Sequence, residues 1–497
     1  MSCTTSTMTI NNAALLWKID VHLVPVLCIL YLMAFLDRVN ISNAALYGLQ
    51  TDLHLTSLQY NTALVIFFVP YVLAEIPSNI LLKRLSPNVW LSLCMGLFGL
   101  TSLCQGLVKS YGGLLTARFF LGLFEAGMFP GCFYLLAMWY RREESMKRYT
   151  FFFCSTTLAG AFGGLLASAI GQMDGVRGWR GWRWVFVIEG AATMIIAAAL
   201  LFLIPNFPET AKFLTPEERE IVKARLVDDV GESQYDEGGD DESHDDTKVI
   251  KRNSRRRKIK DILGVFKDYK IFLGGIMYMG LVVPAYGYAY FAPTIIKDLG
   301  YTSIQAQLHS VPPWACAFFF AMITATLSDQ LRHRWLFSVG TAMLAGTGFI
   351  MLLCIHKNAH AMYAALFLIV CGAYTSMPLL VCWFNTNLAG HLRRSVGSAW
   401  QVGFGNIGGI IAAYSFPSKD GPQYRRGYSI GLAFVCLSIV SSTAYCIGIT
   451  LENQRRDRIQ AADTEASEKG NEKMSDSERQ REKSRSGDLD VSYRYLR

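Results

Sequence analysis

The chain has 497 residues, of which 52% are hydrophobic and only 17% charged, and its formal net charge is +8. Apolar runs of about 20 residues recur along the whole length, which a soluble domain of this size does not need. The composition therefore excludes a soluble globular protein and predicts a polytopic membrane protein.

Twelve of these runs are predicted to cross the membrane as helices. Six lie within residues 21–204 and six within 271–450, so the predicted fold is all-α, with about twelve transmembrane helices in two six-helix halves. The runs begin near Val21, Gln59, Val89, Gly112, Thr150, Trp184, Ile271, Gln307, Trp335, Met362, Val396 and Ser429.

Three polar segments flank the two halves. Residues 1–20 lack the basic start and small-residue cleavage site of a secretory signal peptide, so they are expected to remain as an N-terminal tail. Residues 205–270 form a linker in which an acidic tract precedes a basic cluster, Lys251 to Lys260. We expect this linker to be partly disordered and its basic end to contact anionic lipid rather than nucleic acid. Residues 451–497 are highly charged, which predicts a disordered tail.

The positions of lysine and arginine indicate the orientation. Dense pairs such as Lys83-Arg84 and Arg141-Arg142 fall on the same side as the linker, which predicts that both chain ends are cytoplasmic. Several basic residues, among them Arg177 and Lys419, would then lie outside. We expect a multi-pass protein of the plasma membrane.

The sequence contains no pattern typical of a metal site or an enzyme. Its cysteines are scattered through apolar runs without a Cys-x-x-Cys pair or a His/Cys cluster, which indicates small buried side chains. The external segments are short and hold no paired His/Asp or nucleophile motif. Neither a metal, a cofactor nor a catalytic activity is therefore expected.

Four charged residues within the apolar runs predict a transport site, because burying such groups in lipid is costly. Arg38 is the candidate for binding an anion, since a guanidinium fork matches a carboxylate at two points. The alternative is an arginine that snorkels at the membrane edge. Asp37 is either a second proton site or the partner of Arg38. Arg118 and Glu125 are seven residues apart and share one helix face, about 10 Å apart along the axis.

Six segments spread along the chain carry a resemblance to a known family. They are FLDRVN at 35–40, YVLAEIPSN at 71–79, RFFLGLFEAGMFPG at 118–131, WRWVFVIEG at 182–190, FAPTII at 291–296 and GNIGG at 405–409. With these segments the chain resembles a major facilitator superfamily transporter, and within it the anion:cation symporter family, which includes fungal allantoate and nicotinate permeases. The turn after the second span keeps only Lys83-Arg84 and lacks the usual acidic residue and glycine pair.

The resemblance implies roles for particular residues. Related symporters use the glutamate at the position of Glu125 for proton coupling, whereas the alternative is a permanent Glu-Arg pair that only locks the fold. Tyr71 and Asn406 fall in motifs that line the cavity in relatives. Glu75 and Glu189 read as structural family residues. Further lining candidates are Tyr134, Tyr286, Tyr290, Trp314 and Trp383.

The expected function is proton-coupled uptake of a small organic anion, such as a vitamin, a ureide or an aromatic acid, by alternating access. Arg38 binds the anion with help from Arg118, and Glu125, with Asp37 as a second candidate, carries the proton. The expected partners are the anion, protons and membrane lipid, and the chain is expected to act as a monomer. Export of a secondary metabolite and a nutrient sensor on the same fold stay open as alternatives.

Overall fold

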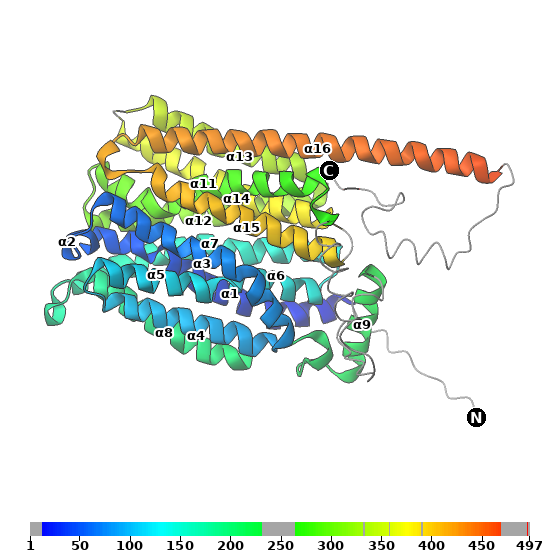
Figure 1. Cartoon of the computed structure of the whole chain (residues 1–497), viewed down its shortest axis with the longest axis horizontal. Helices are drawn as coiled ribbons and strands as arrows, with labels where there is room; N and C mark the ends of the chain where they lie inside the picture. The colour runs from blue at the N-terminus through cyan, green and yellow to red at the C-terminus, as the bar shows by residue number, and fades with distance from the viewer. Residues whose placement is uncertain are drawn as a thin grey trace, which may run out of the picture.

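The computed structural model describes residues 12–230, 264–331, 333–356, 358–388, 391–468 and 495, and all regular structure in these ranges is helical. Long helices run side by side along the length of the molecule (Figure 1). Those of the first half are α1 (Asn12–Leu46), α3 (Ser57–Arg84), α4 (Pro87–Gly106), α5 (Tyr111–Glu125) with α6 (Met128–Trp139), α7 (Arg142–Ile170) and α8 (Gly181–Leu203).

The second half also consists of six long helical segments. Its helices are α11 (Tyr269–Asp298), α12 (Ser303–Leu331), α13 (Arg334–Cys354), α14 (Ala359–Thr386), α15 (His391–Ser415) and α16 (Arg425–Glu468). In the described ranges, 11 helical segments are long and apolar enough to cross a membrane, with α5 and α6 together forming one of them, and α15 is the twelfth long helix. The all-α fold of about twelve membrane helices is confirmed.

Several helices extend beyond the predicted limits of the halves. α1 already begins at Asn12, inside the predicted tail, and the linker contains α9 (Pro216–Val230). α16 continues to Glu468, so residues 451–468 are helical where a disordered tail is expected from composition. The basic cluster of the linker lies outside the described residues.

The second helix of each half begins with the same capping box. At α3, the Gln59 backbone N–H donates to Thr56 Oγ1 (3.2 Å), and the Thr56 backbone N–H donates to Gln59 Oε1 (2.9 Å). At α12, Gln305 and Thr302 make the same two bonds, at 3.3 and 3.1 Å. The shared Thr-Ser-x-Gln start is a trace of internal repetition between the halves.

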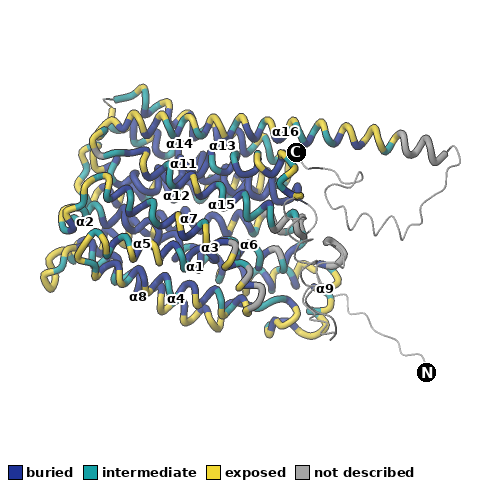
Figure 2. The backbone as a smooth tube through the Cα atoms, viewed as in Figure 1, coloured by how far each residue is buried: buried dark blue, intermediate teal, exposed yellow. Residues whose placement is uncertain are grey.

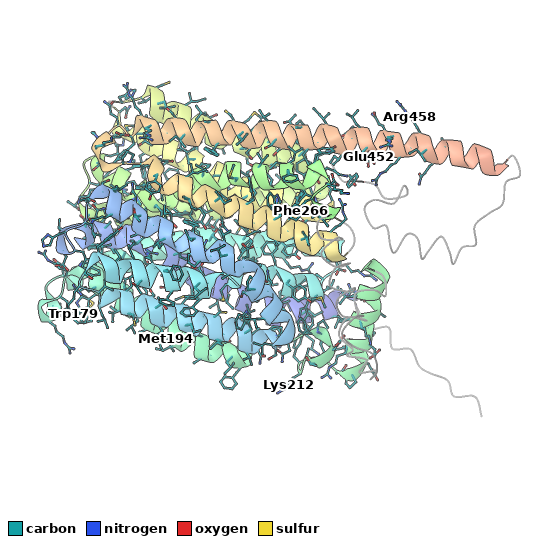
Figure 3. The ribbon with its side chains drawn as sticks, viewed as in Figure 1. Trp179, Met194, Lys212, Phe266, Glu452 and Arg458 are labelled. Atoms are coloured by element: carbon teal, nitrogen blue, oxygen red, sulfur yellow. The ribbon has the colours of Figure 1, made fainter. Side chains whose placement is uncertain are left out.

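The outer surface of the bundle is apolar along its middle. Exposed positions follow the outward helix faces (Figure 2), and Phe202 is 87% exposed. Among the labelled side chains, Met194 lies between Trp179 at the α2 end (α2, Leu49–Asp52) and Lys212 at the α9 end, where the charged residues Glu452 and Arg458 also lie (Figure 3). This apolar belt is the surface that lipid covers.

The halves meet through α7 against α12 and α3 against α15. The close contacts lie in the parts of these helices nearer α2. A Cβ on Gly164 would lie 2.7 Å from Ser310 Oγ and 3.0 Å from the Gln307 backbone oxygen. Between α3 and α15, the hydroxyl oxygens of Thr62 and Tyr414 are 3.4 Å apart. The structure is therefore closed between the halves at the α2 end.

This packing predicts a stability effect. We expect Gly164→Val to lower the apparent midpoint of thermal unfolding by a few degrees, because overpacking costs about 1–3 kcal/mol. Gly340→Val is the control, since a Cβ at Gly340 would meet nothing within 4 Å. Equal midpoints for both variants would show that α7 and α12 do not approach this closely in the folded protein.

Candidate functional site

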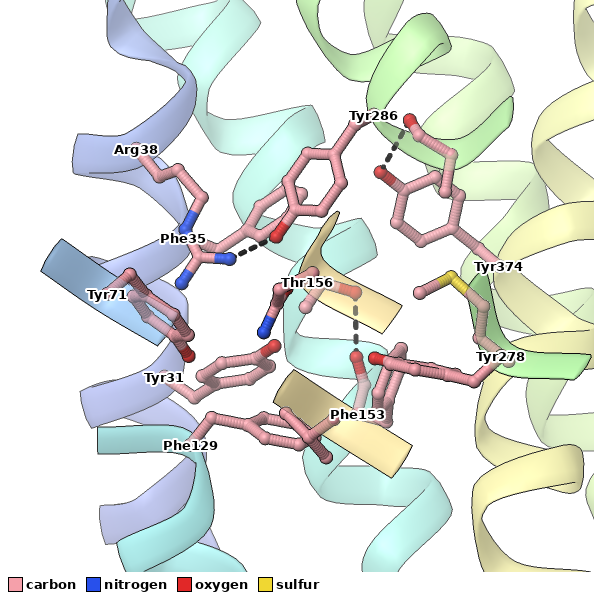
Figure 4. A pocket seen from close by; sticks show the side chains of 14 residues that line it. Tyr31, Phe35, Arg38, Tyr71, Phe129, Phe153, Thr156, Tyr278, Tyr286 and Tyr374 are labelled. Atoms are coloured by element: carbon pink, nitrogen blue, oxygen red, sulfur yellow. Dashed lines mark hydrogen bonds between the residues drawn. The ribbon is translucent and has the colours of Figure 1, made fainter. Parts of the chain in front are cut away.

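A cavity lies between the two halves (Figure 4). The first half contributes side chains from α1, α3, α6 and α7, and the second half from α11, α14 and α15. Its lining is mostly aromatic, with one cation. The lining residues are Tyr31, Phe35, Arg38, Tyr71, Phe129, Phe153, Thr156, Tyr278, Ala285, Tyr286, Tyr374, Met377, Val402 and Asn406.

Arg38 is the charged centre of this cavity. Its Nε donates to Glu125 Oε1 at 3.0 Å, and its Nη2 donates to the same oxygen. Its Nη1 donates to the Tyr286 hydroxyl of the opposite half (Figure 4). Arg38 is 3% exposed and Glu125 1% exposed. The pair is thus a buried ion pair at the edge of the cavity.

Aromatic rings surround the guanidinium. Its central carbon lies 5.0 Å from the ring centroids of both Phe67 and Tyr71, and 5.8 Å from that of Tyr286. Rings at these distances stabilise a buried cation. Because α1 continues to Leu46, Arg38 lies within the helix and does not snorkel at an exposed edge.

The helix that carries Glu125, α5, packs closely against α3, which carries the cavity residue Tyr71. A Cβ on Gly122 would overlap the Phe67 backbone oxygen, so α5 can lie this near α3 only with glycine at that position. On α1, Tyr31 and Phe35 share a face with Arg38, seven and three residues before it. Counting back from the charged residue by helical turns would have found these two lining residues from the sequence.

Asp37 faces away from the cavity. Its carboxylate accepts hydrogen bonds from Ser102 Oγ at 2.9 Å and from Thr193 Oγ1 at 3.0 Å, within the first half. The interpretation of Asp37 as the partner of Arg38 is wrong for this conformation, because neighbours on a helix point about 100° apart and Glu125 occupies the guanidinium.

Arg118 lies beside the cavity but not in its lining. Its Nη1 donates to the Arg38 backbone carbonyl at 3.3 Å, while its Nε and Nη2 have no partner among the described residues. Although Arg118 and Glu125 share the buried face of α5, the ion pair of Glu125 is with Arg38.

The remaining predicted lining residues divide into two groups. Tyr71, Tyr286 and Asn406 line the cavity. Trp314 instead packs behind the lining, with ring centroids 4.6 Å from Tyr374, and Tyr134, Tyr290 and Trp383 are also outside it. Among the described residues, no group of three or more histidine, cysteine or acidic side chains could hold a metal ion.

The model of the Major Facilitator Superfamily matches residues 27–413. The chain belongs to this superfamily. Curated relatives include an uncharacterised transporter of Schizosaccharomyces pombe, 33% identical over 90% of this chain and 86% of its own length. The MFS-type transporter cnsO of Penicillium expansum is 33% identical over 92% of this chain and 87% of its own length.

Solved structures show the same superfamily fold. The proton:xylose symporter XylE matches with a TM-score of 0.61 and 15% identity, over 87% of this chain and 95% of that one. A bacterial homologue of the human lysosomal transporter Spinster, inward-facing and occupied, matches with a TM-score of 0.60 and 15% identity, over 85% and 95%. In this superfamily chain, the cavity lies between the two halves, where transporters of this build bind substrate.

Proposed function

We propose that this transporter takes up a small organic anion together with protons. The observation that carries the proposal is Arg38, a cation 3% exposed, beside a cavity and held by a carboxylate that a ligand's carboxylate can replace. A guanidinium recognises both carboxylates with the same fork. The proposal includes the anion:cation symporter family as the subfamily, the plasma membrane as the location and a monomer with cytoplasmic ends.

The exchange of carboxylates on Arg38 couples anion and proton. When the anion binds the guanidinium of Arg38, Glu125 loses its ion-pair partner. Because Glu125 is buried, an isolated negative charge there is costly. Glu125 then takes up a proton and becomes neutral. When the anion leaves, Glu125 returns to Arg38 and its proton departs. Asp37 is proposed as a second proton site, since it is buried in the same half.

Alternating access needs a link between the halves that depends on the ligand. Arg38 of α1 donates to the Tyr286 hydroxyl of α11, so the cation at the binding site also bridges the two halves. An anion on Arg38 therefore acts at the place where the halves rock against each other. Arg118 would help through its unpartnered donors, and its bond to the Arg38 carbonyl fixes the local backbone of α1.

The lining favours a carboxylate that carries a ring. Tyr71 and Tyr286 present aromatic faces beside Arg38, and Asn406 offers an amide that can donate and accept. Nicotinate and benzoate combine one carboxylate with one aromatic ring, so they are suitable probes of this lining.

A competition assay tests the anion class. Vesicles that contain the protein take up labelled nicotinate, benzoate or allantoate at acidic external pH, and unlabelled compounds compete. We expect carboxylates to compete and the matched neutral amides, nicotinamide and benzamide, to fail. Competition by the amides as strong as by the acids would contradict an anion site. Accumulation that needs a proton gradient directed opposite to the substrate movement would indicate an exporter, and binding without uptake would indicate a sensor.

A further inference from the structure

Glu75 is a buried acid that the exchange on Arg38 does not use. It lies on α3, is 2% exposed, and neither of its carboxyl oxygens has a hydrogen-bond partner among the described residues. The other buried acids of the first half differ in this respect. Glu125 is bonded to Arg38, Asp37 accepts from Ser102 and Thr193, and Glu189 accepts from the Asn40 amide.

The carboxyl of Glu75 lies at the seam between the halves. A Cβ on Gly403 of α15 would be 3.4 Å from Glu75 Oε2, so α15 covers the carboxyl with bare backbone. Tyr71, one turn away on α3, and Tyr278 of α11 are the titratable groups that interact with it, and both line the cavity. Glu75 therefore lies next to the cavity, and α15 of the opposite half covers its carboxyl.

Among the described side chains, none forms an ion pair with Glu75 in this conformation. On α5, which packs along α3, the charged residues Arg118 and Glu125 both bond to Arg38. The sequences of α4 and α6 contain no charged residue, and the two arginines of α15 lie nine or more residues along the helix from Gly403. An ionised carboxylate without a partner is costly in such a place, so the carboxyl is neutral and holds a proton here.

We propose that Glu75 is a further proton carrier beside Glu125, which holds its proton while α3 and α15 are in contact and releases it to water when these two helices separate at the α9 end. The proposal rests on the proposed proton-coupled function. In the release step the O–H bond of the carboxyl breaks, water accepts the proton, and the carboxylate becomes hydrated. Rebinding of the proton precedes closure of the seam.

The position of Glu75 along α3 sets the side of release. Glu75 is nine residues from Arg84 at the α9 end of the helix, about 13 Å, and 18 residues from Ser57 near α2, about 27 Å. The close contacts between the halves lie nearer α2, so opening at the other end brings water to Glu75 first. A monoanion that moves with two protons carries net positive charge, so its uptake responds to the membrane potential.

Infrared spectroscopy tests the proposal without any substrate. The full chain in lipid vesicles is titrated from acidic to alkaline pH, and the carbonyl stretch of protonated carboxyls is followed. We expect the wild type to lose a band that is absent from Glu75→Gln at every pH and present in Glu75→Asp. Glu189→Gln is the matched control, a buried acid within one half, and it should retain the Glu75 band. A titrating band equal to wild type in Glu75→Gln, or a Glu75 band that persists unchanged to alkaline pH, would overturn the proposal.

Gly403→Ser supplies a second measurement that leaves the carboxyl in place. The space opposite Glu75 Oε2 admits a Cβ, and the added hydroxyl can donate to the carboxyl. We expect the Glu75 band to shift to lower frequency, whereas no shift would contradict the placement of the carboxyl at this seam. This variant carries the test if Glu75→Gln does not fold. Vesicle uptake without any proton dependence would refute the proposed function and leave the infrared result to be judged separately.

Discussion

Replacing Arg38 with alanine is expected to abolish saturable uptake of every carboxylate that the wild-type protein transports. The change removes the fork that holds the ligand and leaves Glu125 buried without a partner. Truncating one partner of a buried, hydrogen-bonded charge pair in a binding site costs about 2–5 kcal/mol, and 3 kcal/mol corresponds to a loss of more than about 100-fold in apparent affinity. Concentration-dependent uptake of labelled nicotinate or benzoate in vesicles measures this loss.

Two further variants test whether the loss comes from the geometry of the guanidinium, from its charge or from a defect in folding. Arg38→Lys keeps the charge but not the planar fork, so we expect uptake between those of the wild type and Arg38→Ala. Arg148→Ala removes a different arginine–carboxylate pair, with Asp20 at 2.7 Å, which is not part of the cavity. Uptake should persist in Arg148→Ala. Saturable uptake in Arg38→Ala at the wild-type affinity would refute the anion site at Arg38.

The helical fold could be predicted because each span needs only local information. A run of about 20 apolar residues is long enough to cross a bilayer wherever it packs, so the twelve predicted starts coincide with twelve long helical segments. The limits of helices outside the membrane were harder to predict. α16 continues to Glu468 through a charged segment in which Arg456 Nε donates to Glu452 Oε1 at 3.1 Å. Composition alone indicates disorder there, although charge pairs of this spacing support a helix.

The pairing within the site could not be predicted in the same way. The cost of buried charge identifies Arg38 and Glu125 as functional candidates, but the choice of partner depends on which helices approach each other. Glu125 of α5 and Arg38 of α1 are 87 residues apart, so their contact depends on tertiary packing that no local pattern predicts. Spacing along one helix relates Glu125 to Arg118 instead. The lining by Tyr278 and Tyr374 depends on the opposite half, which no local pattern places beside Arg38.

Glu125→Gln is expected to separate exchange of the anion from its accumulation. Glutamine has the shape of a protonated glutamate but cannot release a proton, so Arg38 loses its anionic partner and stays available to the ligand. Anion exchange between the two sides at equal pH should persist. Each proton that is coupled to a monoanion contributes about tenfold accumulation for a gradient of one pH unit. In Glu125→Gln the accumulation ratio should therefore fall about tenfold below that of the wild type.

Anion exchange and anion accumulation are both measured with labelled nicotinate or benzoate in one vesicle preparation. Exchange is followed without the pH gradient and accumulation with it. Accumulation in Glu125→Gln equal to that of the wild type would refute its coupling role and leave the Arg38 pair as a purely structural lock. Asp37→Asn is the informative comparison, since Asp37 is equally buried but bonded to Ser102 and Thr193 rather than to Arg38. Loss of accumulation in Asp37→Asn as well would mean that the anion on Arg38 is coupled to two carboxylates. Because Asp37 does not contact the guanidinium, its proton would then depend on movement of α1 against α4 and α8, whereas that of Glu125 depends on the ligand directly.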